Sequence, residues 1–359
     1  MIKIITILGA RPQFIKAAIV SKALSSYPNI KEIIVHTGQH FDHNMSEIFF
    51  TEMDIPIPLY NLDIHSLSHG AMTGRMIENI EGILMKEMPD FVMIYGDTNS
   101  TIAGALAAKK LHIKVIHVEA GVRSFNIKMP EEINRILTDR ISDILFSPTD
   151  IAVKNLKNEG FNNIDCQIIK NGDVMQDAAY FYANLSHEKS TIIRDQNATN
   201  YILATLHRAE NTDNPKRMNE IIGALNDIHK DKKIILPLHP RTRNILTKMN
   251  LKVDVDVIDP VGYFDMLELI KNADLIVTDS GGLQKEAFFF KKHCVTLRDE
   301  TEWVELLDNG FNILGGNSKK VIKENIKKMM EKKSDFNINL YGNGIASEKI
   351  AEYLNNISL

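Results

Sequence analysis

Short apolar runs alternate with amphipathic stretches along the whole chain. Each run in the first half ends at, or just before, a Gly, Ser or Thr, and helical patterns such as 12–25 and 101–110 follow. Apolar strands that alternate with helices are typical of a parallel sheet with helices on both faces. The strands predicted in this half are Ile2–Leu8, Glu32–Thr37, Phe91–Gly96, Val115–Glu119 and Ile144–Ser147.

The second half repeats this design. Helices are predicted at Arg217–His229, Tyr263–Lys271 and Leu283–Phe290, between further apolar runs. Those runs are Tyr201–Thr205, Lys233–His239, Val255–Ile258, Leu275–Thr278 and Cys294–Leu297.

A turn-rich tripeptide at residues 171–173 marks the expected domain boundary. We therefore predict an α/β protein with Rossmann-like domains at 1–172 and 173–344, and a last helix at 345–359 that returns to the first domain. Ligands of open α/β sheets bind beyond the carboxyl ends of the strands. Two parallel sheets that face each other would form a central cleft there.

Composition narrows the class of protein. A length of 359 residues fits two domains at roughly 150 residues each. The net charge of -4 gives no overall attraction to nucleic acid or to an anionic membrane. Cys166 and Cys294 are far apart and have no metal-like spacing, so we expect reduced thiols. Without a convincing signal peptide or an apolar stretch of ~20 residues, we expect a cytoplasmic protein that does not insert into a membrane.

Cations follow the first predicted strand. Arg11 and Lys16 fall on the first turns of a helix whose N-terminus attracts anions. The alternative is that both are solvated surface residues. The stretch lacks a Gly-x-Gly-x-x-Gly fingerprint, which argues against a bound dinucleotide.

Three acidic residues lie at strand ends or at a helix start in the first half. Asp97 and Glu131 could each simply stabilise the beginning of a helix. Glu119 closes an otherwise apolar run, and a buried carboxylate is costly unless something uses it. Together, Asp97, Glu119 and Glu131 would supply the acid and base groups that proton abstraction requires.

The second half carries a candidate phosphate site. Ser280, Gly281 and Gly282 follow a strand and open a helix, so their backbone N–H groups could cradle a phosphate. Glu286, one turn further on, could accept both hydroxyls of a ribose. The alternative is an ordinary strand–helix turn. His207, with Arg208, closes another strand at the same edge and would suit a phosphate.

Three further residues are weaker candidates. Gln39 and His40 follow the second predicted strand, and His239 ends another. Each could contact a ligand, and a polar loop explains them equally well.

Taken in order, these motifs resemble the non-hydrolysing UDP-N-acetylglucosamine 2-epimerases from about residue 1 to residue 310. The resemblance implies a GT-B fold, a homodimer, a UDP-sugar substrate, and no metal or nicotinamide cofactor. The motifs are Gly9-Ala10-Arg11-Pro12 with Lys16, Gly38-Gln39-His40, Gly96-Asp97-Thr98, His117-Val118-Glu119-Ala120-Gly121, Pro130-Glu131-Glu132 with Asn134-Arg135, His207-Arg208, Asp279-Ser280-Gly281-Gly282 with Glu286, and Arg298-Asp299.

The resemblance also implies roles for individual residues. Asp97, Glu119 and Glu131 would be the catalytic carboxylates, joined by His207. Gln39, His40 and His239 would form a second, activating sugar-nucleotide site. The residues that would hold UDP are Arg11, Lys16, Arg135, His207, Ser280, Gly281, Gly282 and Glu286, with Val261 and Met266 near the uracil.

Some positions depart from the family pattern. Ala10 and Gln13 stand where the family often has Thr and Glu, and Trp303 stands where an arginine that contacts the nucleotide is expected. Val261 and Met266 stand where many members have Gln and Phe. The variants around Ala10 and Gln13 and at Trp303 also resemble a branch that acts on modified sugars, including UDP-2,3-diacetamido-glucuronate and N-acetylated deoxyhexoses.

The chemistry explains why such a site would need both cations and carboxylates. The carbon 2 proton of a UDP-N-acetylhexosamine is not acidic, but loss of UDP from carbon 1 makes it removable. We therefore predict interconversion of UDP-N-acetylglucosamine and UDP-N-acetylmannosamine through a 2-acetamidoglucal, for surface polysaccharide precursors. The alternatives are a 2-epimerase of a modified UDP-sugar, a hydrolysing 2-epimerase and a GT-B glycosyltransferase.

Overall fold

The computed structural model describes residues 1–39, 53 and 55–357. The chain divides into two compact units: residues 1–178 with 339–359 form unit 1, and residues 179–338 form unit 2. Each unit contains one parallel sheet with helices packed on it.

The sheet of unit 1 has seven parallel strands in the order β3-β2-β1-β4-β5-β6-β7. The chain begins in the middle of the sheet, builds one edge, and then crosses β1 to build the other. Ligand sites in such sheets lie where the strand order reverses, here at the carboxyl ends of β1 and β4. The strands are β1 Ile2–Leu8, β2 Ile30–His36, β3 Tyr60–Asn61, β4 Phe91–Tyr95, β5 Lys114–Val118, β6 Ile144–Ser147 and β7 Gln167–Lys170.

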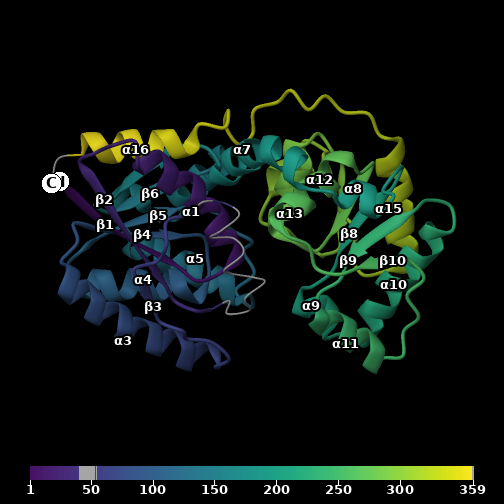
Figure 1. Ribbon diagram of the computed structural model, residues 1–359, viewed down its shortest axis with the longest axis horizontal. Coiled ribbons are helices and arrows are strands. Elements are labelled where there is room, and N and C mark those ends of the chain that lie inside the picture. Colours follow the sequence, from purple (N-terminus) through teal and green to yellow (C-terminus); the bar gives the residue numbers. More distant parts are fainter. Residues whose placement is uncertain (40–52, 54, 358–359) are drawn as a thin grey trace. The chain divides into compact units, whose positions relative to one another are not determined.

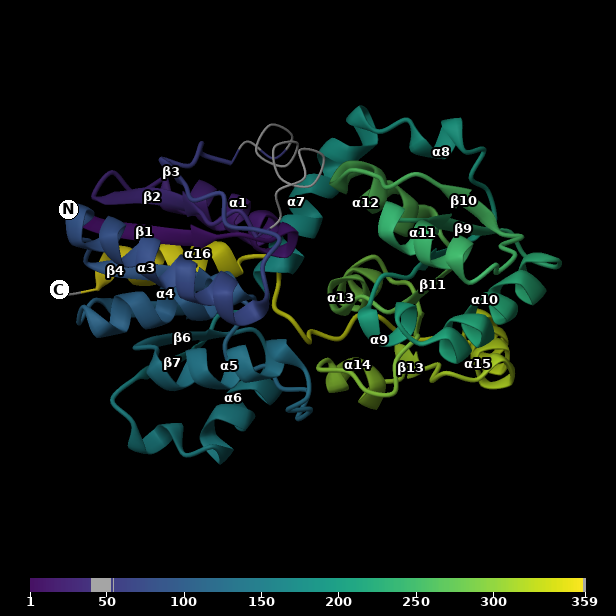
Figure 2. The ribbon, with the colours of Figure 1, turned by 90° about the horizontal axis from the view of Figure 1, so that it is seen from below.

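Helices cover both faces of this sheet (Figure 1). On one face α3 packs against α4, and α4 packs against α5 (Figure 2). On the other face α1 packs against α16, the last helix of the chain. The helices are α1 Arg11–Leu24, α3 His69–Glu87, α4 Asn99–Lys110, α5 Pro130–Ile141, α6 Asp150–Asn158, the 3₁₀ turn η2 Phe161–Asn163, α7 Val174–Lys189, which runs on into unit 2, and α16 Ala346–Asn356.

Alternate residues of the central strands explain how α3 and α4 are held. Ile5 and Ile7 of β1 share a core cluster with Val92 and Ile94 of β4 and with apolar residues of both helices. A Cβ atom on Gly104 of α4 would lie 3.0 Å from Ile94 and 3.1 Å from Ile7. The glycine therefore lets α4 approach the sheet closely.

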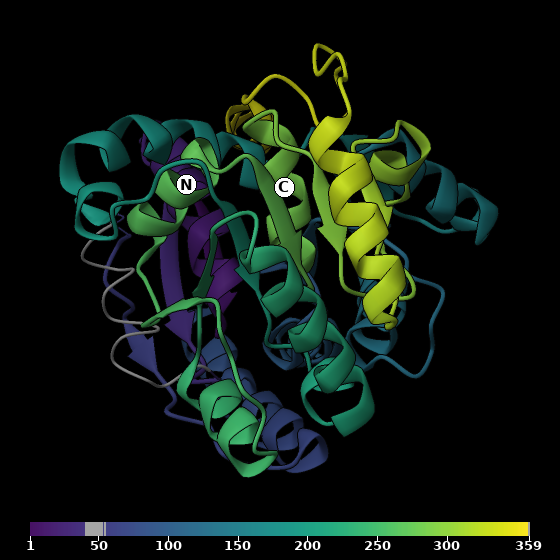
Figure 3. The same cartoon turned by 90° about the vertical axis from the view of Figure 1, so that its right-hand side faces the viewer.

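Unit 2 has six parallel strands in the order β10-β9-β8-β11-β12-β13. Helices α10 and α15 lie side by side and share a core cluster with the sheet (Figure 3). The strands are β8 Ile202–Thr205, β9 Ile234–Pro237, β10 Asp256–Ile258, β11 Leu275–Thr278, β12 Cys294–Thr296 and β13 Asn312–Leu314. The helices are α8 Ile192–Asp195, α9 Ala209–Thr212, α10 Pro215–His229, α11 Pro240–Lys248, α12 Tyr263–Asn272, α13 Gly281–Phe289, α14 Val304–Asp308 and α15 Lys319–Glu331.

The predicted class, two parallel α/β sheets of Rossmann type, is confirmed. The predicted runs Ile2–Leu8, Ile144–Ser147 and Leu275–Thr278 match β1, β6 and β11 residue for residue. The short edge strands β3 and β13 were not predicted, because neither is a buried apolar run. Within the described residues, no helix is both long and apolar enough to cross a bilayer.

Candidate active site

Three strand ends of unit 1 meet at Gly9. A Cβ atom on Gly9 would lie 2.1 Å from both Thr37 Oγ1, just after β2, and Ser100 Oγ, in the first turn of α4, so any other residue would have to displace these hydroxyls. Gln13 closes the turn after β1: its Oε1 accepts hydrogen bonds from Gly9 N at 2.8 Å and Ala10 N at 3.0 Å. Its Nε2 donates to Tyr95 O at 2.9 Å, which ties the turn to β4.

The Gln39 side chain also bonds to the first turn of α4. Its Oε1 accepts hydrogen bonds from Ser100 Oγ at 2.8 Å and Ser100 N at 3.2 Å, so it satisfies a free backbone donor in the first turn of α4. Its proposed partner in an activating site, His40, lies outside the described residues. The Gln39 carbonyl is therefore engaged at this edge of the sheet.

An ion pair lies above the end of β4. Lys16 Nζ is 2.6 Å from Glu119 Oε1, and the two side chains are only 6% and 11% exposed. A Cβ atom on Gly96 would lie 3.4 Å from that nitrogen and 3.5 Å from that oxygen. The structure thus brings together two residues that the sequence assigned separately, Lys16 to phosphate and Glu119 to catalysis. Arg11, at the first position of α1, is partly buried on the neighbouring turn.

Asp97 is held by an arginine from α5. Its Oδ2 accepts a hydrogen bond from Arg135 Nη2 at 2.5 Å, and Arg135 Nη1 donates to Glu132 Oε2 at 2.8 Å. The Arg135 side chain is 5% exposed. In this structure the guanidinium, expected to contact UDP, therefore bridges two carboxylates of its own unit.

The two adjacent glutamates of α5 differ in their surroundings. Glu132 is buried and accepts hydrogen bonds from Ser124 N and Phe125 N as well as from Arg135. Burial alone would raise the pKa of Glu132, but these donors and the arginine charge together lower it. Glu132 thus fastens the loop before α5. Glu131 is partly exposed, and its side chain has no hydrogen bond or ion pair within the described part of the chain.

A buried charge network lies beneath these carboxylates. His117 Nδ1 is 2.6 Å from Asp139 Oδ1, and His117 Nε2 is 2.7 Å from Gly96 O. Asp139 Oδ2 accepts hydrogen bonds from Gly121 N at 3.0 Å and Arg123 Nη1 at 2.7 Å. Burial would raise the pKa of Asp139, but the charges of His117 and Arg123 and their hydrogen bonds hold it below its usual value.

In unit 2 a buried aspartate organises the turn after β8. Asp279 accepts hydrogen bonds from His207 N at 3.0 Å and Arg208 N at 2.9 Å, and its Oδ1 is 3.1 Å from His207 Nδ1. Burial would raise the pKa of Asp279, but the charge of His207 and these hydrogen bonds lower it. The His207 ring is 53% exposed, so the turn presents it at the carboxyl edge of the sheet.

The turn after β11 leads directly into α13. Ser280 caps this helix: its Oγ accepts a hydrogen bond from Leu283 N at 3.4 Å. Gly281 and Gly282 form the first turn. A Cβ atom on Gly281 would lie 2.4 Å from Glu302 Oε1, so the Glu302 carboxylate sits against this turn, where Arg298 Nη1 holds it at 2.8 Å. The helix start therefore already attracts one anionic group of the protein.

The remaining predicted residues occupy different settings. Glu286 is buried, and its Oε1 accepts a hydrogen bond from Tyr263 Oη at 3.1 Å. Met266 belongs to a core cluster of unit 2, and Val261 packs against that cluster from a partly exposed position. His239 caps α11, where its Nδ1 accepts a hydrogen bond from Arg241 N at 3.3 Å.

Trp303 stands where the resemblance led us to expect an arginine. The ring is buried at the start of α14, and Lys285 Nζ lies 3.9 Å from its centroid. This distance is within the range of a cation–π contact. A positive charge is thus present beside Trp303, supplied by Lys285.

Sequence reasoning missed several of these residues. His117 and Asp279 were quoted within motifs but received no role, and Asp139, Gln13 and Glu132 received none either. Their common signal is a polar residue inside an otherwise apolar or helical segment, which must find a partner when it is buried.

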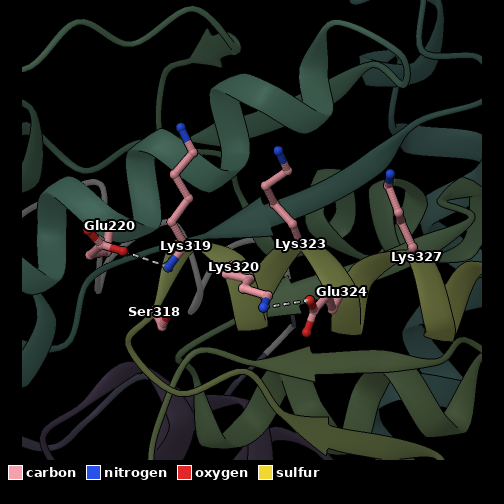
Figure 4. Close-up of a pocket in the computed structure, with 7 residues that line it drawn as sticks. All are labelled: Glu220, Ser318, Lys319, Lys320, Lys323, Glu324 and Lys327. Atoms are coloured by element: carbon pink, nitrogen blue, oxygen red, sulfur yellow. Dashed lines mark hydrogen bonds and ion pairs between the residues drawn. The ribbon is translucent and has the colours of Figure 1, made fainter.

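A hollow in unit 2 is lined largely by lysine side chains of α15. Lys319, Lys323 and Lys327 of α15 line it and point toward α10 (Figure 4). Lys319 Nζ and Lys323 Nζ lie 2.9 Å and 2.8 Å from Asp227 Oδ2 of α10. The hollow contains no residue from a strand end, and these ion pairs hold α15 against α10.

The chain is similar to known proteins over nearly its whole length. The family model for UDP-N-acetylglucosamine 2-epimerase matches residues 22–355. A Pseudomonas aeruginosa protein named UDP-2,3-diacetamido-2,3-dideoxy-D-glucuronate 2-epimerase is 56% identical, covering 98% of this chain and 99% of its own. A UDP-N-acetylglucosamine 2-epimerase from Methanocaldococcus jannaschii is 44% identical and covers 98% of both chains.

The fold is similar to that of a solved structure. The crystal structure of the M. jannaschii UDP-GlcNAc 2-epimerase in complex with UDP-GlcNAc and UDP superimposes with a TM-score of 0.92. It is 45% identical, and the match covers 98% of this chain and 99% of that one. The predicted GT-B fold class is therefore confirmed. The chain belongs to the UDP-N-acetylglucosamine 2-epimerase family.

Proposed function

We propose that this protein inverts carbon 2 of a UDP-2-acetamido sugar without hydrolysing it, and interconverts UDP-N-acetylglucosamine and UDP-N-acetylmannosamine. The observation that carries the proposal is the set of groups at the carboxyl edge of the unit 1 sheet. There, Glu119 is paired with Lys16, Asp97 is paired with Arg135, and Glu131 begins α5. Carboxylates can supply the general acid and base of a reaction that removes and returns a proton.

The reaction proceeds by elimination and re-addition. The bond between carbon 1 and the UDP oxygen breaks, UDP leaves with the electron pair, and a carboxylate takes the carbon 2 proton. This gives 2-acetamidoglucal and UDP. UDP then adds back to carbon 1, and a proton is delivered to the opposite face of carbon 2. No oxidant or reductant is consumed.

The charged groups divide the work of this reaction. Glu119, Asp97 and Glu131 take up and return the proton. Lys16, paired with Glu119, and Arg11, at the start of α1, are cations that can stabilise a departing diphosphate. In unit 2 the Ser280–Gly282 turn offers backbone N–H groups to phosphate, His207 faces outward at a neighbouring strand end, and Glu286 binds the ribose. We further propose that the protein acts as a homodimer in the cytoplasm.

Two observations favour a second substrate. The relative named for UDP-2,3-diacetamido-2,3-dideoxy-D-glucuronate is 56% identical to this chain, whereas the M. jannaschii UDP-N-acetylglucosamine 2-epimerase is 44% identical. Trp303 in place of the family arginine points in the same direction. UDP-2,3-diacetamido-2,3-dideoxy-D-glucuronate is therefore the second candidate substrate.

Product analysis by NMR separates these possibilities. The purified protein is incubated without an acceptor with UDP-N-acetylglucosamine or with UDP-2,3-diacetamido-2,3-dideoxy-glucuronate, and the carbon 2 configuration is read from the proton couplings. The proposal expects an intact UDP-sugar of inverted configuration, and the ratio of initial rates identifies the preferred sugar. Free N-acetylmannosamine with UDP would indicate a hydrolysing enzyme. Absence of conversion of either sugar would contradict the proposal.

A further inference from the structure

His117 lies inside β5 with both ring nitrogens engaged. The side chain is fully buried; Nδ1 faces the carboxylate of Asp139 at 2.6 Å and Nε2 faces the carbonyl oxygen of Gly96 at 2.7 Å. A carboxylate and a carbonyl oxygen can only accept hydrogen bonds. The geometry therefore favours hydrogen on both ring nitrogens, as in the imidazolium form of His117.

The charge of His117 is balanced within a short chain of ions. Asp139 is fully buried and also accepts a hydrogen bond from Arg123 Nη1 at 2.7 Å. Arg123 is in turn bound on its other side by Glu159, with Nε–Oε1 and Nη2–Oε2 distances of 2.8 Å. Two cations and two anions alternate, so each buried charge has a partner.

This chain of ions contacts the three segments that carry the proposed catalytic carboxylates. Gly96, whose carbonyl His117 holds, immediately precedes Asp97. Glu119 is the second residue after His117, and Gly121, the second residue after Glu119, donates its backbone N–H to Asp139. Asp139 therefore binds the residue two positions before Glu119 and the residue two positions after it.

Helix α5 connects Glu131, the third carboxylate, to the same chain of ions. Residues 131, 135 and 139 are spaced by four and so lie along one side of the helix. Arg135 fastens this side to Asp97 at the end of β4, and Asp139 fastens it to His117 in β5. Two ion pairs one turn apart thus hold the side of α5 on which Glu131 lies.

The backbone around these contacts is unusual. Glu119 has a φ of +77°, although it is not a glycine, and Gly96 and Gly121 have φ values of +62° and +82°. A side chain at positive φ is held only where its surroundings fix it, and such residues concentrate at functional sites. The hydrogen bonds of His117 and Asp139 lie on either side of Glu119.

We propose that the buried His117–Asp139 ion pair is a positioning device that aligns Asp97, Glu119 and Glu131 for proton transfer; this inference rests on the proposed function. Stability alone explains the pair poorly, because well-packed apolar residues often replace a buried ion pair at no loss of stability. Apolar residues, however, cannot donate a hydrogen bond to the Gly96 carbonyl or accept one from the Gly121 amide, so they cannot fix these two backbone groups in place. The pair therefore provides alignment of the turns that carry Asp97 and Glu119.

The main test compares variants within the same chain of ions. His117→Gln and Asp139→Asn remove charges that touch the strand ends, whereas Glu159→Gln removes a charge at the far end, beyond Arg123. We expect the first two to lower kcat by ~10²-fold, the scale of a misplacement near 1 Å, with KM and UDP affinity nearly unchanged. Glu159→Gln should lower the melting temperature but leave kcat close to that of the wild type. A loss of kcat that follows the loss of stability equally in all three variants would overturn the proposal.

An apolar replacement separates alignment from stability. The double variant His117→Phe with Asp139→Leu leaves Arg123 paired with Glu159 and should fold, but should show the same loss of kcat. A folded double variant with wild-type turnover would refute the positioning role. If the double variant does not fold, a cycle with Glu119→Gln decides: His117→Gln should cost far less in that background, and additive losses would contradict the proposal.

The protonation of His117 provides a readout that does not depend on activity. Nitrogen NMR of histidine-labelled wild-type protein at neutral pH should show both ring nitrogens of His117 protonated, with the assignment made from His117→Gln. A neutral ring would overturn the inference. Wild-type protein that converts no UDP-sugar but shows this imidazolium would refute the proposed function and leave the ion pair established.

Discussion

Lys16 Nζ lies 2.6 Å from Glu119 Oε1, and both groups sit directly above the backbone of Gly96. The cation proposed to bind phosphate and the carboxylate proposed to accept the proton are thus in contact in the structure without substrate. Since both side chains are nearly buried, each one stabilises the charge of the other, and loss of either partner removes that stabilisation from a buried charge.

Glu119→Gln should abolish most of the activity without unfolding the protein. Glutamine keeps an oxygen that can accept from Lys16 but cannot take up a proton, so turnover should fall by ~10²-fold or more, the scale of a general base. The measurement is kcat for carbon 2 epimerisation. UDP affinity and the melting temperature, measured on the same variant, show whether binding and folding are retained.

The matched control is Glu87→Gln. Glu87 pairs with Lys3 at 2.8 Å near the opposite end of β1, and its side chain is 16% exposed. This variant should alter stability but not turnover. Asp97→Asn and Glu131→Gln should behave like Glu119→Gln, and near-normal turnover in all three would remove the carboxylates from the mechanism.

Glu286→Ala should weaken the binding of UDP. If the buried carboxylate accepts a ribose hydroxyl, its removal costs about 1.5–3 kcal/mol, as for other hydrogen bonds to charged groups. Isothermal titration calorimetry with UDP measures the change. Tyr263→Phe is the control, because it removes a hydrogen bond to Glu286 at 3.1 Å but keeps the carboxylate, and it should weaken UDP binding less. Unchanged affinity in Glu286→Ala would mean that Glu286 only packs in unit 2.

Asp279 should make stability depend on acid pH. Its pKa is below the usual value of 3.8 in the folded protein, because His207 and backbone N–H groups outweigh the cost of burial. The folded state therefore binds fewer protons than the unfolded state, so this stability is fully present above the unfolded pKa and is lost as pH falls through the folded one.

A melting series from neutral to acid pH tests this dependence. The wild type should lose stability below about pH 4, and Asp279→Asn, already less stable at neutral pH, should lose less over the same acid range. Asp139 and Glu132 act with the same sign, so only the difference between variant and wild type identifies Asp279. Parallel curves would contradict the contribution of Asp279.

The sequence predicted the sheet positions well because the strands are buried on both faces. Runs such as Leu275–Thr278 are continuously apolar and bounded by turns, so periodicity alone places β11. The same pattern fails at β3, a strand of two residues at the edge of the sheet, where no buried run exists.

Most of the charged candidates were chosen because they follow the carboxyl end of a predicted strand. The residues with which they pair, however, depend on tertiary contacts. No local signal pairs Arg135 with Asp97 across 38 positions, or Lys16 with Glu119 across 103. For the same reason Glu131 and Glu132 look alike in sequence, although only Glu132 is buried and saturated with donors. Met266 was expected near the nucleotide, and its place in a core cluster could not be read from the chain.

The last prediction concerns the course of the reaction. If UDP leaves before or together with the carbon 2 proton, the intermediate is a glycal, and the proton that returns comes from a group such as Glu119 that exchanges with water. A reaction run in deuterated water should therefore place deuterium at carbon 2 of the product, as read by NMR and mass spectrometry. Long incubation should also release small amounts of UDP and 2-acetamidoglucal, because an active site that opens sometimes loses its intermediate. An epimerase that works by oxidation and reduction would move hydride and retain protium at carbon 2. Retained protium, or activity that requires added NAD, would refute elimination and with it the roles given to Asp97, Glu119 and Glu131.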